Sequence, residues 1–159
     1  MQPVEAKDQL HQWLRRRGID PLEGLRHQVK TREGSECLLW LPEQDTALFV
    51  FIQITTLTMP QDNVLLTLSM ALNLDPSRTG GAALGYNPES NQLLLRSVHP
   101  MDDLDDEALD RIMTRLSQLA GSLQRYLKDF RYQEKSGRAV HKEPRVLPSL
   151  QRTPRTFMT

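Results

Sequence analysis

Acidic side chains are concentrated between residues 102 and 110, where their density could serve a hard cation such as Ca²⁺. They are Asp102, Asp103, Asp105, Asp106, Glu107 and Asp110. An EF-hand calcium loop needs a glycine at its sixth position and a glutamate at its twelfth, and neither Asp102 nor Asp103 as a start supplies both. Acidic residues also favour the first turn of a helix, where Asp103 can cap the backbone and Glu107 can pair with Arg111. We therefore expect the start of a helix here and no metal site.

Two further clusters have the residue types of a phosphate-binding element. The triplet from Arg15 to Arg17 ends a predicted helix, where cationic side chains stabilise the negative end of the helix dipole. Gly80, Gly81 and Gly85 lack the Lys-Ser/Thr pair and the preceding strand of a nucleotide-binding loop. We expect the triplet to stabilise the end of its helix. We expect the paired glycines either to adopt positive φ angles or to let another backbone approach closely.

The histidines and the single cysteine show no catalytic or metal-ligating spacing. His11, His27, His99 and His141 lie in different segments, and none belongs to a His-Glu-x-x-His pattern. Cys37 lies in an apolar segment typical of an inert buried thiol, and no serine occupies a Gly-x-Ser-x-Gly turn. We predict no catalytic residue, no cofactor and no metal. An enzyme would require the fold to bring His99 or His27 beside Cys37, or to pair carboxylates in a cleft.

The chain of 159 residues is neutral overall, but its charge is unevenly distributed along the sequence. Residues 1–130 carry 13 Lys and Arg against 18 Asp and Glu, whereas residues 131–159 carry 7 against 2. An acidic body with a basic tail lacks the overall positive field of most nucleic-acid binders. The apolar stretches at 47–54 and 64–74 are too short to cross a bilayer, which takes roughly 20 residues. One cysteine and no signal-peptide pattern predict a protein of the reducing cytoplasm.

The spacing of apolar residues predicts an α+β fold with the order α-β-β-β-α-β-β-α. The expected elements are helices at 3–17, 61–74 and 102–130 and strands at 25–31, 37–41, 47–54, 82–86 and 92–98. They form one domain over residues 1–130, in which helices pack on a twisted antiparallel sheet. Residues 131–159 lose the periodicity and contain three prolines, so we expect a tail that is disordered or loosely docked.

Two of these elements carry more apolar surface than a single chain can bury. In the strand at 47–54, one face carries Phe49 and Phe51, and the other carries Leu48, Val50, Ile52 and Ile54. A helix of the same chain can cover one face, and the other requires a loop, a second subunit or a ligand chain. The helix at 61–74 is apolar around most of its circumference, which favours a subunit interface.

Five short motifs occur in a specific order between residues 65 and 127. They are Leu72-Asn73 at the end of the central helix, Gly80-Gly81 before a hairpin, Leu84-Gly85-Tyr86, Gln92-Leu93-Leu94-Leu95, and Pro100-Met101-Asp102-Asp103 before the last helix. In these motifs the segment resembles class I type III secretion chaperones of the Tir-chaperone (CesT) family, and the element order extends the likeness to residues 1–130. The resemblance implies a non-enzymatic homodimer of the bacterial cytoplasm. Such a homodimer binds an extended N-terminal segment of secreted effectors, keeps it unfolded and soluble, and directs it to the secretion apparatus.

The resemblance also implies two functional surfaces that are made of apolar residues. The expected dimer interface is Leu65, Leu68, Leu72, Leu84 and Tyr86. The expected effector-binding residues are Leu10, Trp13, Leu14, Leu25, Val29, Leu39 and Phe49. The basic tail is a candidate contact for the secretion ATPase or the sorting machinery, and no membrane insertion is expected. The alternative is a dimeric regulator that binds nucleic acid through Arg15 to Arg17 and the tail, with an affinity that falls steeply with salt.

Overall fold

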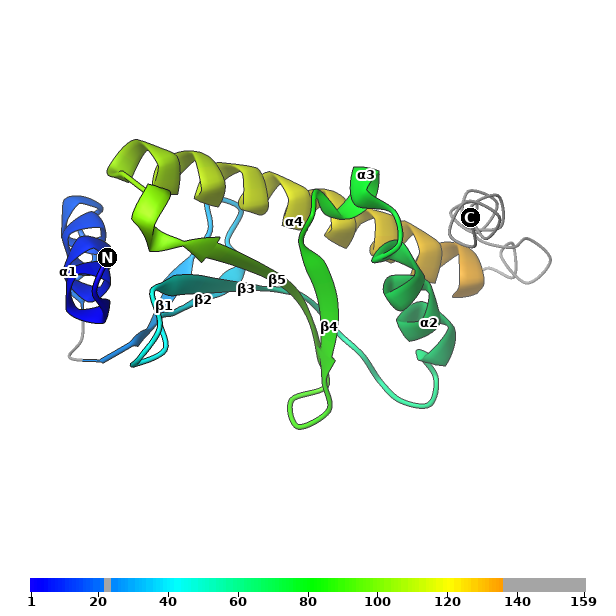
Figure 1. Cartoon of the computed structure of the whole chain (residues 1–159). Coiled ribbons are helices and arrows are strands. Elements are labelled where there is room, and N and C mark those ends of the chain that lie inside the picture. Colours follow the sequence, from blue (N-terminus) through cyan, green and yellow to red (C-terminus); the bar gives the residue numbers. More distant parts are fainter. Residues whose placement is uncertain (22–23, 136–159) are drawn as a thin grey trace, which may run out of the picture.

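The computed structural model describes residues 1–21 and 24–135 as an α+β fold (Figure 1). The helices are α1 (Pro3–Arg16), α2 (Asn63–Leu72), α3 (Pro76–Thr79) and α4 (Asp106–Lys135), with a 3₁₀ turn, η1, at Met101–Asp103. The strands are β1 (Arg26–Lys30), β2 (Glu36–Trp40), β3 (Ala47–Thr56), β4 (Ala83–Asn87) and β5 (Gln92–Pro100). The predicted order of long helices and strands is confirmed, and α3 and η1 are additions to it.

The five strands form one antiparallel sheet in the order β1-β2-β3-β5-β4. The central strand, β3, pairs with β2 on one side and with β5 on the other, so that Phe49 lies opposite both Trp40 and Val98. The outermost strands are β1 and β4, each of which pairs with one neighbour within the described residues. A strand at an edge presents unpaired N–H and C=O groups, to which a further extended segment can add.

The long helix α4 crosses one face of the sheet, and α1 lies at the end of the sheet near β1 (Figure 1). On β3 the side chains of Leu48, Val50, Ile52 and Ile54 enter the core with α4 and are at most 5% exposed. These residues alternate with half-buried ones along the strand, as period-two patterning requires. The prediction that a helix of this chain covers one face of β3 is confirmed. None of the helices in the described part of the chain combines the length and apolar character needed to cross a bilayer.

The last helix starts and ends later than predicted. Its cap is Asp105 rather than Asp103, because the Asp105 carboxylate accepts a hydrogen bond of 2.8 Å from the backbone N–H of Ala108. Leu104 is extended and separates η1 from α4. The helix then continues to Lys135, so residues 131–135 of the predicted tail belong to it. The remainder of that tail, residues 136–159, lies outside the described residues.

A short helix that the periodicity did not predict, α3, follows α2. Asp75 caps it by accepting a hydrogen bond of 3.1 Å from the Ser77 N–H, and Pro76 occupies its first turn. Gly80 ends it in the left-handed region at φ 59°, and Gly81 follows at φ 86°. The expected positive φ angles of the paired glycines are therefore confirmed.

Asp62, the residue directly before α2, contacts residues outside that helix. It occupies the cap position of α2, but its side chain makes no cap hydrogen bond. One of its oxygens instead accepts hydrogen bonds of 2.7 Å from the Thr58 N–H and 3.1 Å from the Arg131 guanidinium. Arg131 also donates to the Thr56 carbonyl oxygen at 3.3 Å. This contact ties the end of α4 to the loop that leads into α2.

Candidate functional site

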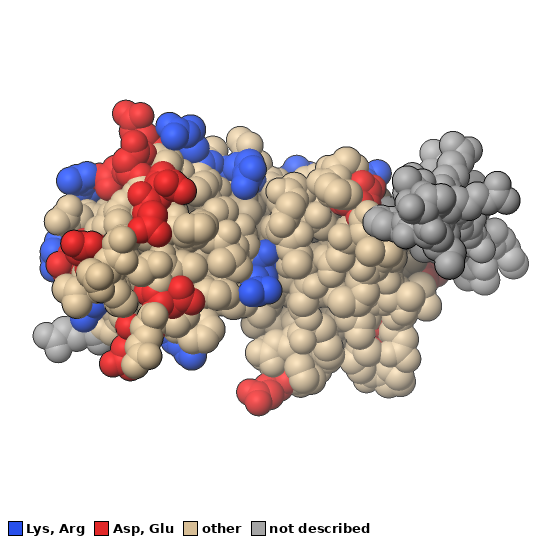
Figure 2. All heavy atoms as spheres, in the orientation of Figure 1, with Lys and Arg blue, Asp and Glu red and all other residues tan. Residues whose placement is uncertain are grey.

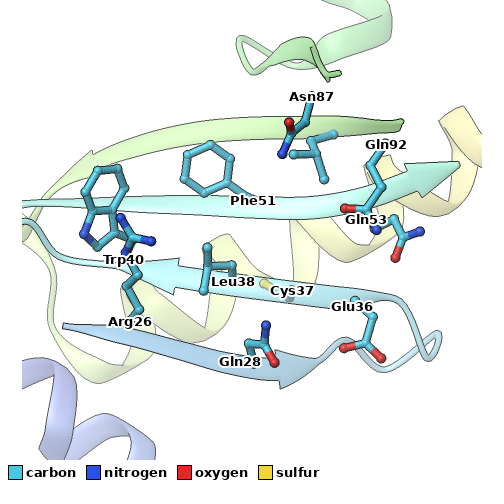
Figure 3. Close-up of a pocket in the computed structure, with 11 residues that line it drawn as sticks. Arg26, Gln28, Glu36, Cys37, Leu38, Trp40, Phe51, Gln53, Asn87 and Gln92 are labelled. Atoms are coloured by element: carbon cyan, nitrogen blue, oxygen red, sulfur yellow. The ribbon is translucent and has the colours of Figure 1, made fainter. Parts of the chain in front are cut away.

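The face of the sheet opposite α4 carries apolar side chains that no described element covers. This open sheet face comprises Leu38, Trp40, Phe49, Phe51, Leu94 and Val98, of which the first five are half-buried and the last is exposed. A hollow of about 570 Å³ lies on it, with Phe51 and Leu38 near its middle and Trp40 at one end (Figure 3). Its polar lining residues are Arg26, Gln28, Glu36, Gln53, Asn87 and Gln92. Because apolar side chains form its middle and polar groups its rim, the hollow suits an amphipathic ligand.

Aromatic rings on the open sheet face are held by their neighbours. The rings of Trp40 and Phe49 lie 5.8 Å apart with an interplanar angle of 44°. The guanidinium of Arg26 lies 4.6 Å from the centre of the Trp40 ring, and that of Arg96 lies 5.3 Å from the Phe49 ring. Such cation–π contacts fix the rings and place positive charge at the rim of an apolar surface.

A second, shallower groove of about 970 Å³ runs between α1 and the start of β1. Its apolar lining includes Val4, Leu25, Trp40 and Leu41, and Val4 is 69% exposed. Trp40 lines both this groove and the hollow on the open sheet face. Arg26 also lines both, so the two surfaces meet at Trp40 and Arg26, which could contact a ligand on either of them.

The residues predicted to bind an effector fall into two groups. Four are at most 6% exposed and form part of the protomer's own core: Leu10, Trp13, Leu14 and Leu39. Three are half-buried and lie at surface hollows or on the open sheet face: Leu25, Val29 and Phe49. The structure thus leaves the second group accessible to a partner and uses the first to hold α1 against the sheet.

The predicted effector-binding residues did not include Trp40, Phe51, Leu38 or Leu94, although these four line the hollow on the open sheet face. A signal for Phe51 was present, because it shares the second apolar face of the central strand with Phe49. The strand at 37–41 is also apolar on both faces, and its alternate residues are Leu38 and Trp40. Pairing of the two strands brings these faces together.

The residues predicted for a dimer interface are mostly interior within the protomer. Four of them are at most 3% exposed, and they are Leu65, Leu68, Leu72 and Leu84. Tyr86 is half-buried and donates a hydrogen bond of 2.7 Å to Asn91. The exposed apolar residues of the same region are Val64, Met70 and Leu74, at 51%, 38% and 67% exposure. The surface over α2, α3 and β4 carries few charged side chains in this view, unlike the opposite end of the molecule (Figure 2).

The arginine triplet and the acidic cluster are partners of one another. Arg16 pairs with Asp106 and Arg17 pairs with Asp110, which joins the end of α1 to the first turns of α4. The Arg17 guanidinium, and after it the Trp13 N–H, lower the pKa of Asp110. The predicted pairing of Glu107 with Arg111 is present at 3.8 Å. Within residues 1–21 and 24–135, no three His, Cys, Asp or Glu side chains converge on a candidate metal position.

The thiol and the imidazoles occupy interior positions. Cys37 is 2% exposed, and burial raises the pKa of its thiol to about 12, as expected for an inert cysteine. His27 is 4% exposed, and its ring stands perpendicular to that of His11 with a centroid distance of 5.2 Å. Burial, and after it the charge of His11, lower the pKa of His27. The Nε2 atom of His99 shares a hydrogen bond of 2.6 Å with the Ser97 hydroxyl oxygen.

A five-stranded antiparallel sheet with one face covered by a long helix and the other open defines an α+β fold class. The family model described as the Tir chaperone protein (CesT) family matches residues 10–124. The chain belongs to the Tir chaperone protein (CesT) family. The resemblance and the α+β fold expected from the sequence are therefore confirmed. No curated protein sequence matches the chain.

Three solved complexes contain chains with the same fold. One is the ExoU–SpcU complex from the type III secretion system of Pseudomonas aeruginosa, with a TM-score of 0.56 and 15% identity over 72% of this chain and 94% of that chain. The HopA1–SchA chaperone–effector complex contains a chain that matches with a TM-score of 0.57 and 19% identity over 77% of this chain and 95% of that chain. The ExsC–ExsE complex contains a chain that matches with a TM-score of 0.59 and 17% identity over 79% of this chain and 95% of that chain. At these identities the likeness establishes the fold.

Proposed function

We propose that the protein is a homodimeric type III secretion chaperone of the bacterial cytoplasm. In this role it binds an extended N-terminal segment of one or more effectors, keeps the segment unfolded and soluble, and directs it to the secretion apparatus. Membership in the Tir chaperone family supports the class of function. The observation that carries the proposal is the open sheet face, where half-buried Trp40, Phe49 and Phe51 lack any covering element among the described residues.

The open sheet face supplies part of the free energy that binding requires. Complete burial of one large apolar side chain contributes about 1.5–3 kcal/mol, and half-buried side chains retain about half of that to gain. The five half-buried side chains of the face therefore provide about 4–7 kcal/mol before the cost of ordering the bound segment. Main-chain hydrogen bonds along the outer edge of β1 or β4 add to this gain. No covalent chemistry is required.

The proposed dimer forms on α2 and the β4–β5 hairpin. The buried leucines Leu65, Leu68 and Leu72 fix the helix on its own protomer, and the contact with a second copy falls to Val64, Met70 and Leu74. Exposed apolar side chains on one short helix and directly after it suit an isologous twofold contact, the commonest arrangement in oligomers. The sparse charge over α2, α3 and β4 in Figure 2 supports this choice.

The test combines co-expression with a matched pair of substitutions. Purified with candidate effector N-terminal segments, the wild type should give a light-scattering mass of two protomers plus effector. Phe51→Asp should leave the fold intact and weaken capture at least tenfold, because it puts a charge into the apolar hollow. Tyr132→Asp, at a 70%-exposed aromatic of α4, is the control and should bind normally. A monomer that captures none of the segments, or equal capture by both variants, contradicts the proposal.

The basic tail supplies the proposed link to delivery. Residues 131–159 carry 7 Lys and Arg against 2 Asp and Glu. We assign this excess charge to an acidic surface of the secretion ATPase or the sorting machinery, with the effector held on the folded domain.

A further inference from the structure

A small pocket of about 140 Å³ lies between α1, β1 and α4, on the opposite face of β1 from the open sheet face. Its apolar walls are Trp13, Ile19, Val29 and Met113. The pocket adjoins β1, the edge strand whose outer hydrogen-bonding groups have no strand partner among the described residues. A segment added along β1 would place alternate side chains toward this pocket.

One hydroxyl group in the wall of this pocket has no hydrogen-bond partner. Ser117 is 5% exposed, and its Oγ is buried without a partner. A serine within a helix ordinarily donates to the carbonyl four residues earlier, as Ser69 does to Leu65 at 2.7 Å in α2. A buried hydroxyl without a partner is destabilising, so an unsatisfied one beside a cavity indicates a polar group that binds there.

One cation at the mouth of the pocket also lacks an ionic partner. Asp110, which lines the pocket, is already engaged by the Trp13 N–H at 2.8 Å and by Arg17. Arg32 lines the same pocket, is exposed, and forms no ion pair within residues 1–21 and 24–135. The pocket thus combines apolar walls, a buried hydroxyl and the Arg32 guanidinium, which forms no ion pair in that part of the chain although its charge helps to lower the pKa of Asp110. These features complement a side chain with a polar tip, followed or preceded by an acidic residue.

We propose that this pocket selects acidic extended segments of a partner protein. One side chain with an apolar body and a hydrogen-bonding tip enters between α1 and α4 and reaches the Ser117 hydroxyl, while a neighbouring carboxylate pairs with Arg32. The inference rests on the proposed function and adds a charge preference to it. The chain's own residues 136–159 are a poor occupant, because they carry five Lys and Arg against one Glu.

A library of short random peptides displayed on phage tests the charge preference on the full-length protein. The selected peptides should carry Asp or Glu within two positions of an apolar residue. Their affinity, measured by fluorescence anisotropy on synthetic copies, should fall about fivefold in Arg32→Glu. Arg125→Glu makes the same charge change at an exposed position of α4 outside the pocket and should leave the affinity unchanged. Equal losses in both variants, or peptides without acidic bias, overturn the inference.

Ser117→Ala separates a ligand role from a structural one. The variant should melt at the same or a higher temperature, because it removes an unsatisfied hydroxyl from a helix, and it should weaken the selected peptides about threefold or more. Lower stability with unchanged binding overturns the inference.

Two further results separate this inference from the proposed function. A synthetic peptide of residues 136–159 should not compete for the pocket, and competition that Arg32→Glu abolishes would identify the tail as the occupant instead. Peptides that depend on Phe51 but show no charge preference would overturn the pocket alone, whereas failure to select any peptide would count against both.

Discussion

The hydrogen bond between Trp13 and Asp110 should account for a measurable part of the stability of the fold. The Trp13 indole N–H donates to the Asp110 carboxylate at 2.8 Å and joins α1 to α4. Replacing Trp13 with Phe removes the donor and keeps an aromatic ring. Hydrogen bonds to charged groups contribute about 1.5–3 kcal/mol, and the lower value applies here because the Asp110 side chain is 38% exposed and keeps Arg17.

The smaller ring adds a packing cost to the lost hydrogen bond. Trp13 is 6% exposed, so the phenyl ring leaves space against the 140 Å³ pocket that Trp13 lines, at a cost of about 1 kcal/mol. Trp13→Phe should therefore lower the free energy of unfolding by about 2–3 kcal/mol. Trp40→Phe, on the open sheet face, is the matched control and should cost less, since the Trp40 indole makes no hydrogen bond to a described residue.

A double-mutant cycle with Asp110→Ala isolates the hydrogen bond from the packing cost. Urea denaturation of the four proteins should give a coupling energy of about 1.5 kcal/mol between Trp13→Phe and Asp110→Ala. The coupling of Asp110→Ala with Trp40→Phe should be zero within error. A Trp13–Asp110 coupling that is also indistinguishable from zero would refute the assignment of this bond as a stabilising link between α1 and α4.

Two further predictions concern pH and delivery. Burial and the charge of His11 lower the pKa of His27 below its ordinary 6.5. As the pH falls, His27 is therefore protonated in the unfolded chain before it is protonated in the folded one, so the free energy of unfolding should fall as the pH drops below 6.5. His27→Phe should flatten this decline in urea titrations without abolishing it, since burial also lowers the pKa of His99, and an unaltered slope would count against the assignment. A chain truncated after Lys135 keeps the Arg131–Asp62 contact, so it should bind the effector normally. Secretion of that effector should nevertheless be poor, and normal secretion would exclude the proposed role of the tail.

The sequence predicted the sheet and its open face for a physical reason. Period-two alternation assigns every second residue of a strand to one face, so the apolar residues on both sides of the strand at 47–54 already required two coverings. The structure provides one of these coverings, α4, for Leu48, Val50, Ile52 and Ile54. Which residues of neighbouring strands join Phe49 on the other face depends on register, and register is a property of pairing.

In the central helix, α2, apolar periodicity does not predict which side faces the core. When a helix is apolar around most of its circumference, the pattern cannot distinguish the inward side from the outward one. Leu65, Leu68 and Leu72 lie at helical spacing and face the protomer's own core, which leaves Val64 and Met70 at the surface. The side that faces inward is decided by the position of β4 and α4 relative to α2.

Side-chain hydrogen bonds determine where α4 and α2 begin, which the apolar periodicity did not predict. Asp105 caps α4 because η1 occupies the preceding residues, and Asp62 turns toward Arg131 instead of its own helix. The second contact joins residues 69 positions apart, so no local rule could have predicted it. The pairing of Arg16 with Asp106 likewise links two clusters that each looked complete within their own helices.

The anchor of Arg131 gives the last turns of α4 a mechanical role. Its guanidinium bridges the Thr56 carbonyl and the Asp62 carboxylate, four residues before the described chain ends at Lys135. Terminal helical turns ordinarily fray, and amide protons there exchange quickly with water. Here Arg131 ties those turns to the loop before α2, so a pull on the following residues would reach that loop, and with it the proposed subunit contact, before it unwound the helix.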